Sequence, residues 1–159
     1  MEILHAQYRL LQDSRSVLLG YCETISPADF QTDLTGFGGR GIRDVLVHVV
    51  NVYQFWLETI ALEQAAPFDN PESIPTVGEL RPLFAKTDQR VENFLTRFQP
   101  EWGLPLVCSI PGRNQRVETT PLAILTHVIT HEFHHKGQVL SMSRALGYTP
   151  PDTDVIRFS

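Results

Sequence analysis

The sequence predicts an all-α protein, a four-helix bundle with a short extended or hairpin segment before its last helix. The chain has 159 residues, which suits one domain over residues 1–159, and no repeat or linker divides it. Apolar residues recur at helical spacing over four segments of about twenty residues or more. These segments are residues 2–24, 42–65, 76–98 and 120–147. Glycine and proline lie between them, and the connections are long enough to allow several bundle topologies.

The first predicted helix covers residues 2–24. Its apolar side chains at helical spacing are Ile3, Leu10, Leu11, Val17, Leu18 and Tyr21. Ser26-Pro27 ends this helix, because the residue before a proline avoids the α-helical conformation. A loop follows, in which we expect the Gly-Phe-Gly-Gly run at residues 36–39 to be flexible, since glycine has few backbone restrictions.

An irregular stretch separates the second and third predicted helices. The second covers residues 42–65, with apolar positions at Val45, Val49, Val52, Phe55, Trp56 and Ile60. Residues 67–75 are rich in proline, asparagine and aspartate and favour an irregular segment. Thr76, followed three residues later by Glu79, forms a capping-box pattern that begins the third helix, which continues to about Phe98.

The helical period is lost between the third and fourth helices. Residues 106–110 and 115–119 flank the Pro-Gly-Arg-Asn run at 111–114, a pattern that predicts a short hairpin or extended loop. Thr120 is a good N-cap residue, and Pro121 suits the first helical position. The last helix is predicted to end at Gly147, and the remaining residues, 148–159, to be extended.

Composition and charge exclude several classes of protein. The chain has 13 Lys+Arg against 18 Asp+Glu and a net charge of −5, so without a basic run it is a poor candidate for binding nucleic acid. No apolar run approaches the ~20 residues of a membrane span, and the N-terminal residues contain no signal-peptide core. We therefore expect a cytoplasmic protein. Cys22 and Cys108 belong to no CxxC pair and are expected to be separate, buried thiols.

Histidines are concentrated in the last predicted helix. Four of the six histidines lie within nine residues there, at positions 127, 131, 134 and 135. On a helical wheel at ~100° per residue, Ile124 and Met142 superpose on one line of an apolar stripe, and His131 and His135 lie roughly 20° to either side of that line. This stripe comprises Ile124, Val128, Val139, Met142 and Leu146. If the stripe faces inward, the two imidazoles, one turn apart on one helix face, can share a metal ion.

A third ligand is expected from another helix. His48 lies between Val45 and Val52 at heptad-like spacing and is predicted to face inward, and Asp44 could accept a hydrogen bond from its imidazole. Three histidines leave positions open for water or substrate, which is typical of a catalytic metal site. An all-imidazole set suits Zn, Ni, Co, Cu or Fe better than Mg or Ca.

Other interpretations of these residues remain open at this point. Buried histidines are often hydrogen-bonded core residues without a metal. His131 to His135 also match the H-E-x-x-H spacing of zinc proteases, with Glu132 as the general base, although the wheel places Glu132 ~80° from the line through Ile124 and Met142. His134 is expected at the surface or beside a ligand, and His127 is an alternative neighbour of the site. A second apolar group covers much of the other side of this helix, so the sequence does not decide which side faces the core. This group comprises Leu125, Ile129, Phe133 and Leu140.

Two segments of the chain resemble the DinB-like (DinB/YfiT) superfamily of metal-dependent bundle proteins. The matching segments are Ile-Arg-Asp-Val-Leu-Val-His at residues 42–48 and His-Val-Ile-Thr-His-Glu-Phe-His-His-Lys-Gly-Gln-Val at 127–139. The closing Arg-Ala-Leu-Gly at 144–147 also fits, and the resemblance covers nearly the whole chain. The chain departs from the family pattern at Lys136, where arginine is common, and at Thr130, where asparagine is common.

The resemblance implies a bundle of up-down-down-up topology, often dimeric, with a three-histidine site for a divalent metal, commonly Zn or Ni. Carried onto the matching positions, these ligands are His48, His131 and His135. Related branches of the superfamily include thiol S-transferases that use bacillithiol or mycothiol, and a mycothiol-dependent maleylpyruvate isomerase.

Together these observations predict a divalent-metal-binding protein, and they favour an enzyme, a transferase or hydrolase. The metal would activate a water or a low-molecular-weight thiol for attack on a small-molecule substrate. Candidate wall residues of the site are Asn51, Trp56 and Gln138; no catalytic or thiol-binding residue is assigned. A homodimer is expected from the resemblance. The alternatives are a non-enzymatic metal-binding or stress-response protein and a helical bundle with core histidines.

Overall fold

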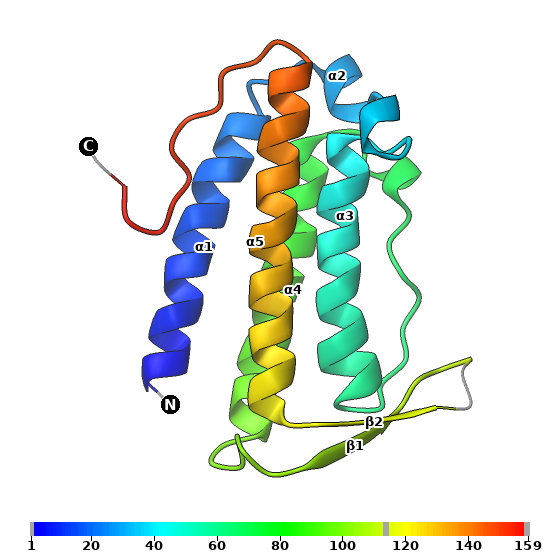
Figure 1. Cartoon of the computed structure of the whole chain (residues 1–159), viewed down its shortest axis with the longest axis vertical. Helices are drawn as coiled ribbons and strands as arrows, with labels where there is room; N and C mark the ends of the chain where they lie inside the picture. The colour runs from blue at the N-terminus through cyan, green and yellow to red at the C-terminus, as the bar shows by residue number, and fades with distance from the viewer. Residues whose placement is uncertain (1, 113–114, 158–159) are drawn as a thin grey trace.

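The computed structural model of the chain describes residues 2–112 and 115–157. Its long helices form a bundle with two short strands at one end (Figure 1). The α-helices are α1 (Glu2–Cys22), α2 (Pro27–Gln31), α3 (Ile42–Tyr53), α4 (Val77–Arg97) and α5 (Pro121–Ala145). The π-helical segment η2 (Gln54–Ile60) continues α3, and the 3-10 helices η1 (Thr35–Phe37) and η3 (Pro71–Ser73) lie in loops. The strands β1 (Leu106–Ser109) and β2 (Arg116–Thr119) pair antiparallel.

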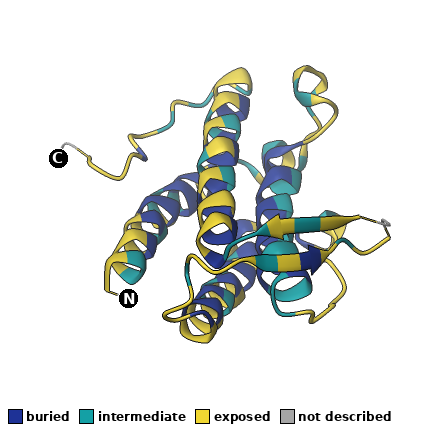
Figure 2. Cartoon of the chain, turned by 60° about the horizontal axis from the view of Figure 1, so that its bottom comes forward, coloured by how far each residue is buried: buried dark blue, intermediate teal, exposed yellow. Residues whose placement is uncertain are grey.

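The long helices follow the expected up-down-down-up order. In Figure 1, α1 and α5 run in one direction, and α3 and α4 run in the other. Helix α3 packs against α4 and α5, and α1 packs against the same two helices. The buried sides of the helices face one another, whereas the hairpin of β1 and β2 is largely exposed (Figure 2). The predicted four-helix bundle with a hairpin before the last helix is confirmed.

The residues that helix α1 buries differ from those that apolar spacing predicted. Leu11 and Leu18 are buried as an apolar stripe requires, but Ile3 and Leu10 are 81% and 49% exposed. The buried stripe instead contains Arg15, which is only 4% exposed. A charged residue therefore occupies a core position of this helix, with partners supplied by other helices.

Two expectations about the connections were wrong. The predicted loop after α1 contains α2 and η1, because Ser26 caps α2 and the 36–39 run closes a hydrogen-bonded turn. The second long helix ends at Ile60 and not at residue 65. The chain leaves it through Glu63, whose φ of 55° is incompatible with a continuing right-handed helix.

The helix starts follow the sequence signals closely. Thr76 and Glu79 form a reciprocal capping box at α4, with N–O distances of 3.0 and 3.3 Å. The hydroxyl of Thr120 accepts a hydrogen bond from the Ala123 amide at 3.1 Å, which begins α5. Gly147 has a φ of 92°, the left-handed conformation expected just after a helix end.

The predicted hairpin is present, and the C-terminal segment packs on the bundle. Leu106 pairs with Thr119 at one end of the hairpin, and the predicted turn positions Arg113 and Asn114 lie outside the described residues. The C-terminal segment was expected to be extended; as far as residue 157 it is irregular, with bends at 154–156. The buried carbonyl of Thr153 accepts hydrogen bonds from the Ser14 hydroxyl at 2.6 Å and the Lys136 ammonium at 2.7 Å, and so attaches this segment to α1 and α5.

No helix of the described residues has the length and apolar character that a membrane crossing requires.

The stripe and the second apolar group of α5 both contribute to the core. Ile124, Val128, Val139 and Met142 are buried, and so are Leu125 and Ile129. The second group therefore packs within one chain and gives no independent support for a dimer interface.

Candidate metal centre

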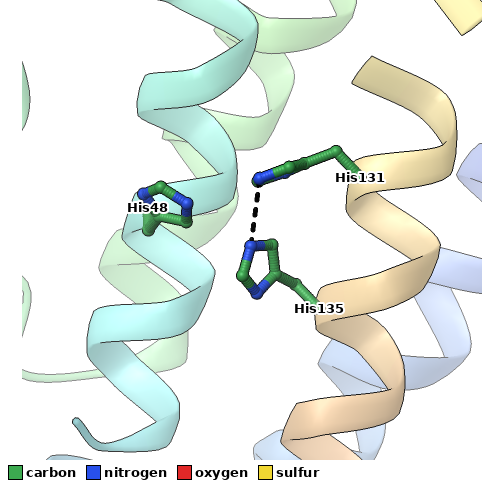
Figure 3. Close-up of side chains that lie close together, drawn as sticks. All are labelled: His48, His131 and His135. Carbon is green, nitrogen blue, oxygen red and sulfur yellow. Dashed lines mark hydrogen bonds between the residues drawn. The ribbon is translucent and has the colours of Figure 1, made fainter. Parts of the chain in front are cut away.

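Three histidines from two facing helices meet inside the bundle. His131 and His135 lie one turn apart on α5, and His48 faces them from α3 (Figure 3). The ring centroid of His48 lies 5.2 Å from that of His131 and 4.8 Å from that of His135. One potential ligand atom from each residue lies within 4.8 Å of the other two, so this group could hold a metal ion. The structure thus brings together the three residues named from the sequence.

A hydrogen bond orients the imidazole of His135. Its Nδ1 lies 2.7 Å from Oε1 of Gln138. Because a carboxamide oxygen can only accept, Nδ1 carries the hydrogen and donates it. The lone pair of Nε2 is then free, and this atom lies 3.1 Å from Nε2 of His131 (Figure 3). A tautomer fixed by a hydrogen bond, with the unprotonated nitrogen directed at a second imidazole, is typical of a metal-ligating histidine.

His131 is hydrogen-bonded through Nε2 to His135, but its other ring nitrogen is left without a partner in the described chain. Its Nδ1 is buried and has no hydrogen-bond partner in residues 2–112 and 115–157. Buried polar side-chain atoms are normally satisfied, and an unsatisfied one costs about 1–3 kcal/mol. This arrangement therefore argues against a purely structural role for the ring.

All three imidazoles favour the neutral form that a metal requires. Burial, followed by the charges of His135 and His48, lowers the pKa of His131 to about 4. Burial is also the largest cause of the lowered pKa of His48, where the charges of His135 and Arg40 add to the effect. The pKa of His135 is lowered by burial as well, although its hydrogen bond with Gln138 opposes the shift. Near pH 7 the lone pairs are therefore available without the loss of a proton.

The residues present fit a divalent ion. In a tetrahedral zinc site, with Zn–N bonds of 2.0–2.1 Å, ligand nitrogens lie roughly 3.3 Å apart. The 3.1 Å between Nε2 of His131 and Nε2 of His135 is close to that value. All three ligand atoms lie within 4.8 Å of one another, so we expect a small side-chain rotation to bring them within bonding distance of one ion.

Asp44 does not assist His48, contrary to the sequence-based expectation. Its Oδ2 accepts a hydrogen bond from the Gly41 amide at 2.9 Å and caps α3. Its Oδ1 pairs with Nε of Arg43 at 3.2 Å. A carboxylate in the first turn of a helix has unpaired amides close by, and these compete successfully for it.

The other candidate residues have varied surroundings. The exposed His134 contacts the Gln138 amide at 3.1 Å, and the exposed His127 packs its ring against Trp56 at 4.9 Å. Both amide atoms of Asn51 are engaged by the backbone of Asp69, so this side chain holds the 67–75 segment against α3. Gln138 is thus the one proposed wall residue whose side chain bonds directly to a member of the histidine group.

The two departures from the family pattern lie away from the histidine rings. The Lys136 ammonium contacts the Ser14 hydroxyl and the Thr153 carbonyl. The Thr130 hydroxyl donates to the backbone carbonyls of Thr126 and His127. Both side chains have structural partners, and neither contacts a proposed ligand.

Glu132 belongs to a separate buried network, so the zinc-protease interpretation is wrong. Arg15 donates to Glu132 from Nε at 2.6 Å and from Nη2 at 2.9 Å, and the Tyr53 hydroxyl donates to Glu132 at 2.7 Å. Asp88 accepts from Arg15 at 2.6 Å and from the Tyr8 hydroxyl at 2.7 Å. With every carboxylate oxygen of Glu132 occupied, this residue is not available as a general base at the histidines.

Apolar periodicity did not reveal this network of Arg15, Glu132, Tyr53, Asp88 and Tyr8. The signal was present: Arg15 lies four residues after Leu11 and three before Leu18, on the stripe that α1 buries. A charged residue on an apolar stripe indicates a buried ion pair. Its partners lie 73 and 117 positions away, and helical periodicity carries no information about contacts between helices.

Two pockets lie at opposite ends of the molecule. A pocket of about 460 Å³ is lined by His135 and Gln138 together with Arg40 and the η1 loop, and so reaches the histidine group. A larger one, of about 610 Å³, lies between the end of η2 and the hairpin and contains none of the three histidines. Because the first pocket is the one that reaches the imidazoles, it is the better candidate for a ligand site, despite its smaller volume.

The two cysteines are free and buried, as expected. Burial raises the pKa of Cys22 to about 12 and also raises that of Cys108. Cys22 lies at the end of α1 and Cys108 in β1, and neither lines the pocket beside the histidines. A thiolate reacting at the histidine group would therefore come from a small molecule.

Comparisons with known proteins agree with the fold and with the resemblance. Protein DinB of Bacillus subtilis (strain 168) is 28% identical over 120 residues, covering 71% of this chain and 69% of that protein. The crystal structure of a DinB-like protein from Bacillus cereus ATCC 10987 superposes with a TM-score of 0.66 at 16% identity, covering 96% of each chain. The profile of the DinB family matches residues 3–159. Because this match spans almost the entire bundle, including both helices that carry the histidines, the chain belongs to the DinB family.

Proposed function

We propose that this protein is a metal-dependent enzyme of the S-transferase type, which activates a low-molecular-weight thiol, or alternatively a water, at His48, His131 and His135. The single observation that carries the proposal is the convergence of three neutral imidazoles within 4.8 Å beside an open pocket. A divalent ion held there would supply Lewis-acid activation, lowering the pKa of a bound thiol or water toward neutrality.

The surrounding residues favour chemistry on an entering molecule. Gln138 fixes the tautomer of His135 and leaves its Nε2 available. Val45 and Met142 supply apolar surface to the pocket wall. No carboxylate occurs among the described residues that line this pocket, so activation by the cation is favoured over general-base catalysis by an acidic residue.

An all-imidazole ligand set favours zinc or nickel over magnesium or calcium. The expected setting is cytoplasmic, with a small-molecule substrate and no nucleic-acid or membrane partner. A homodimer is proposed from family membership alone.

The experiment begins with metal identification. Protein purified without a histidine tag is analysed by elemental mass spectrometry, before and after reconstitution with zinc or nickel. We expect about one ion per chain in wild type and a large loss in His48→Gln. Negligible metal after reconstitution would leave a bundle with core histidines.

Activity is then measured with a panel of low-molecular-weight thiols and electrophiles on the metal-loaded protein. We expect turnover that disappears with a chelator and in His48→Gln. Stoichiometric metal without turnover across the panel would instead support the non-enzymatic metal-binding protein.

A further inference from the structure

The pocket beside the histidines has one charged side chain among the described residues that line it, Arg40. The remaining wall is apolar or neutral and includes Phe37, Val45 and Met142. His135 and Gln138 form the part of the wall nearest the proposed metal centre. A ligand that contacts His135 therefore lies in a pocket whose wall also includes the exposed residue Arg40.

The backbone that carries Arg40 is held by a compact turn. The Leu34 carbonyl accepts hydrogen bonds from the amides of Phe37 at 2.9 Å and Gly39 at 3.1 Å, and the Leu34 amide donates to the Arg40 carbonyl at 3.3 Å. Gly39 has a φ of 72°. The next residue, Gly41, packs so tightly against the backbone of Thr32 that a Cβ on residue 41 would lie 2.5 Å from the Thr32 carbonyl oxygen. The backbone position from which the Arg40 side chain extends is therefore set by the fold.

The guanidinium of Arg40 has no hydrogen bond or ion pair with any other side chain in residues 2–112 and 115–157. The nearby Arg43 differs, because it pairs with Asp44 at 3.2 Å and does not line the pocket. Arg40 also lies beside the N-terminus of α3, where the helix dipole disfavours a cation. Its charge acts on the histidines, since it contributes to the lowered pKa of both His48 and His135.

Charge balance then indicates what the pocket would accept. Three neutral imidazoles leave the charge of a divalent ion uncompensated, and Arg40 adds a further positive charge. No acidic side chain among the described lining residues offsets either one. A ligand with negative charge would relieve this accumulation, and the planar guanidinium matches an anionic oxygen group with two parallel hydrogen bonds.

We propose that the substrate or thiol used by this enzyme carries an anionic oxygen group, a carboxylate or a phosphate, which Arg40 binds while the reacting part lies at the three histidines. This inference rests on the proposed function, because it assumes that the same pocket delivers a molecule to the metal. Arg40 is a specificity-determining residue in this arrangement.

The test compares two thiols that differ in one charge. Zinc-loaded protein is titrated by calorimetry with 3-mercaptopropionate and with its neutral amide, and the metal content is checked after each titration. Wild type is expected to bind the carboxylate probe about three- to tenfold more tightly. Arg40→Gln should remove this preference, and Arg40→Glu should reverse it.

Arg43→Gln is the matched control, because it removes a neighbouring positive charge outside the pocket and should keep the wild-type preference. Competition by propionate and by inorganic phosphate then distinguishes a carboxylate site from a phosphate site. Equal affinity of wild type for the two thiols, or an unchanged preference in Arg40→Gln, would overturn the inference.

The two proposals can fail separately. If zinc binds and both thiols bind without charge preference, the inference about Arg40 fails and the proposed function stands. If neither thiol binds but propionate or phosphate still binds in an Arg40-dependent manner, the anion site stands and the thiol chemistry fails.

Discussion

His131 and Glu132 are consecutive residues of α5, but they belong to polar clusters of opposite character. Glu132 enters a network with Arg15 and Tyr53 in which both carboxylate oxygens are occupied. His131 enters a group in which its own Nδ1 has no partner in the described chain. The polar atoms of the first cluster are paired within the protein, whereas the second cluster is a group of side chains that could hold a metal ion.

The pKa shifts of the two clusters also reflect whether the buried groups have partners. Burial by itself would lower the pKa of Arg15, but the charge and hydrogen bonds of Glu132 outweigh this effect and the pKa is raised. Burial and the charge of Glu132 raise the pKa of Tyr53, so its hydroxyl remains a donor. Among the described residues, no carboxylate compensates for the burial of the histidines, and the pKa of each is lowered even though the hydrogen bond with Gln138 opposes the shift of His135. Burial alone therefore does not identify a functional group; the partners of the buried atom do.

The largest expected effect is a loss of stability in the network. Glu132→Gln leaves the buried charge of Arg15 without its main partner, which costs about 3–5 kcal/mol of unfolding free energy. Chemical denaturation of the metal-free protein measures this loss. Glu23→Gln is the matched control, because Glu23 pairs with Arg81 at the surface, with side chains 46% and 40% exposed. An equally small change in the two variants would contradict the structural role of Glu132.

The second effect separates the histidine group from its neighbours. Zinc at one hundred times its dissociation constant should raise the unfolding free energy of wild type by about 2.7 kcal/mol, because only the folded chain has the site. His135→Ala should lose this gain, whereas His134→Ala, which changes the exposed neighbour, should keep it. Thermal denaturation with and without zinc measures both. A retained gain in His135→Ala would remove His135 from the ligand set.

A smaller effect is expected at Gln138. Gln138→Ala frees the tautomer of His135 and should lower zinc affinity about 10–100-fold, as with other residues that orient metal ligands. Asn51→Ala is the control, since this amide binds only the backbone of Asp69 in the described chain and should leave zinc affinity unchanged. Competition with a chromophoric chelator gives the two affinities. An unaltered affinity in Gln138→Ala would show that the hydrogen bond has no influence on the metal.

The smallest effect concerns acid stability of the metal-free protein. The pKa of His131 is lowered from 6.5 to about 4, so between these values the unfolded chain binds a proton that the folded chain does not. The contribution of His131 to stability should therefore be constant above pH 6.5 and decrease as the pH falls toward 4, which lowers the Tm. His131→Gln should show a shallower decrease. A Tm that rises over this interval would have the wrong sign.

Local signals accounted for most of the fold. The capping residues Thr76 and Thr120 were identified correctly because a cap bonds to amides within three residues. The residue range of the second helix was too long, since its end at Ile60 coincides with π-helical geometry that apolar spacing does not reveal. Asp44 was assigned to the wrong partner because the wheel locates a residue on a helix but does not rank the groups that compete for its side chain.

By itself, the sequence determined the helical segments, the hairpin and the pairing of His131 with His135, because each depends on periodicity within one segment. His48 was expected as the third member of this group from its spacing and from the family resemblance, and the tertiary structure places it there. Only the tertiary structure decided that Arg15 pairs with Glu132 and that Arg40 lines the same pocket as His135. These contacts join residues far apart in the chain. Their energies arise from desolvation and charge pairing between helices, which exist only once the bundle has assembled.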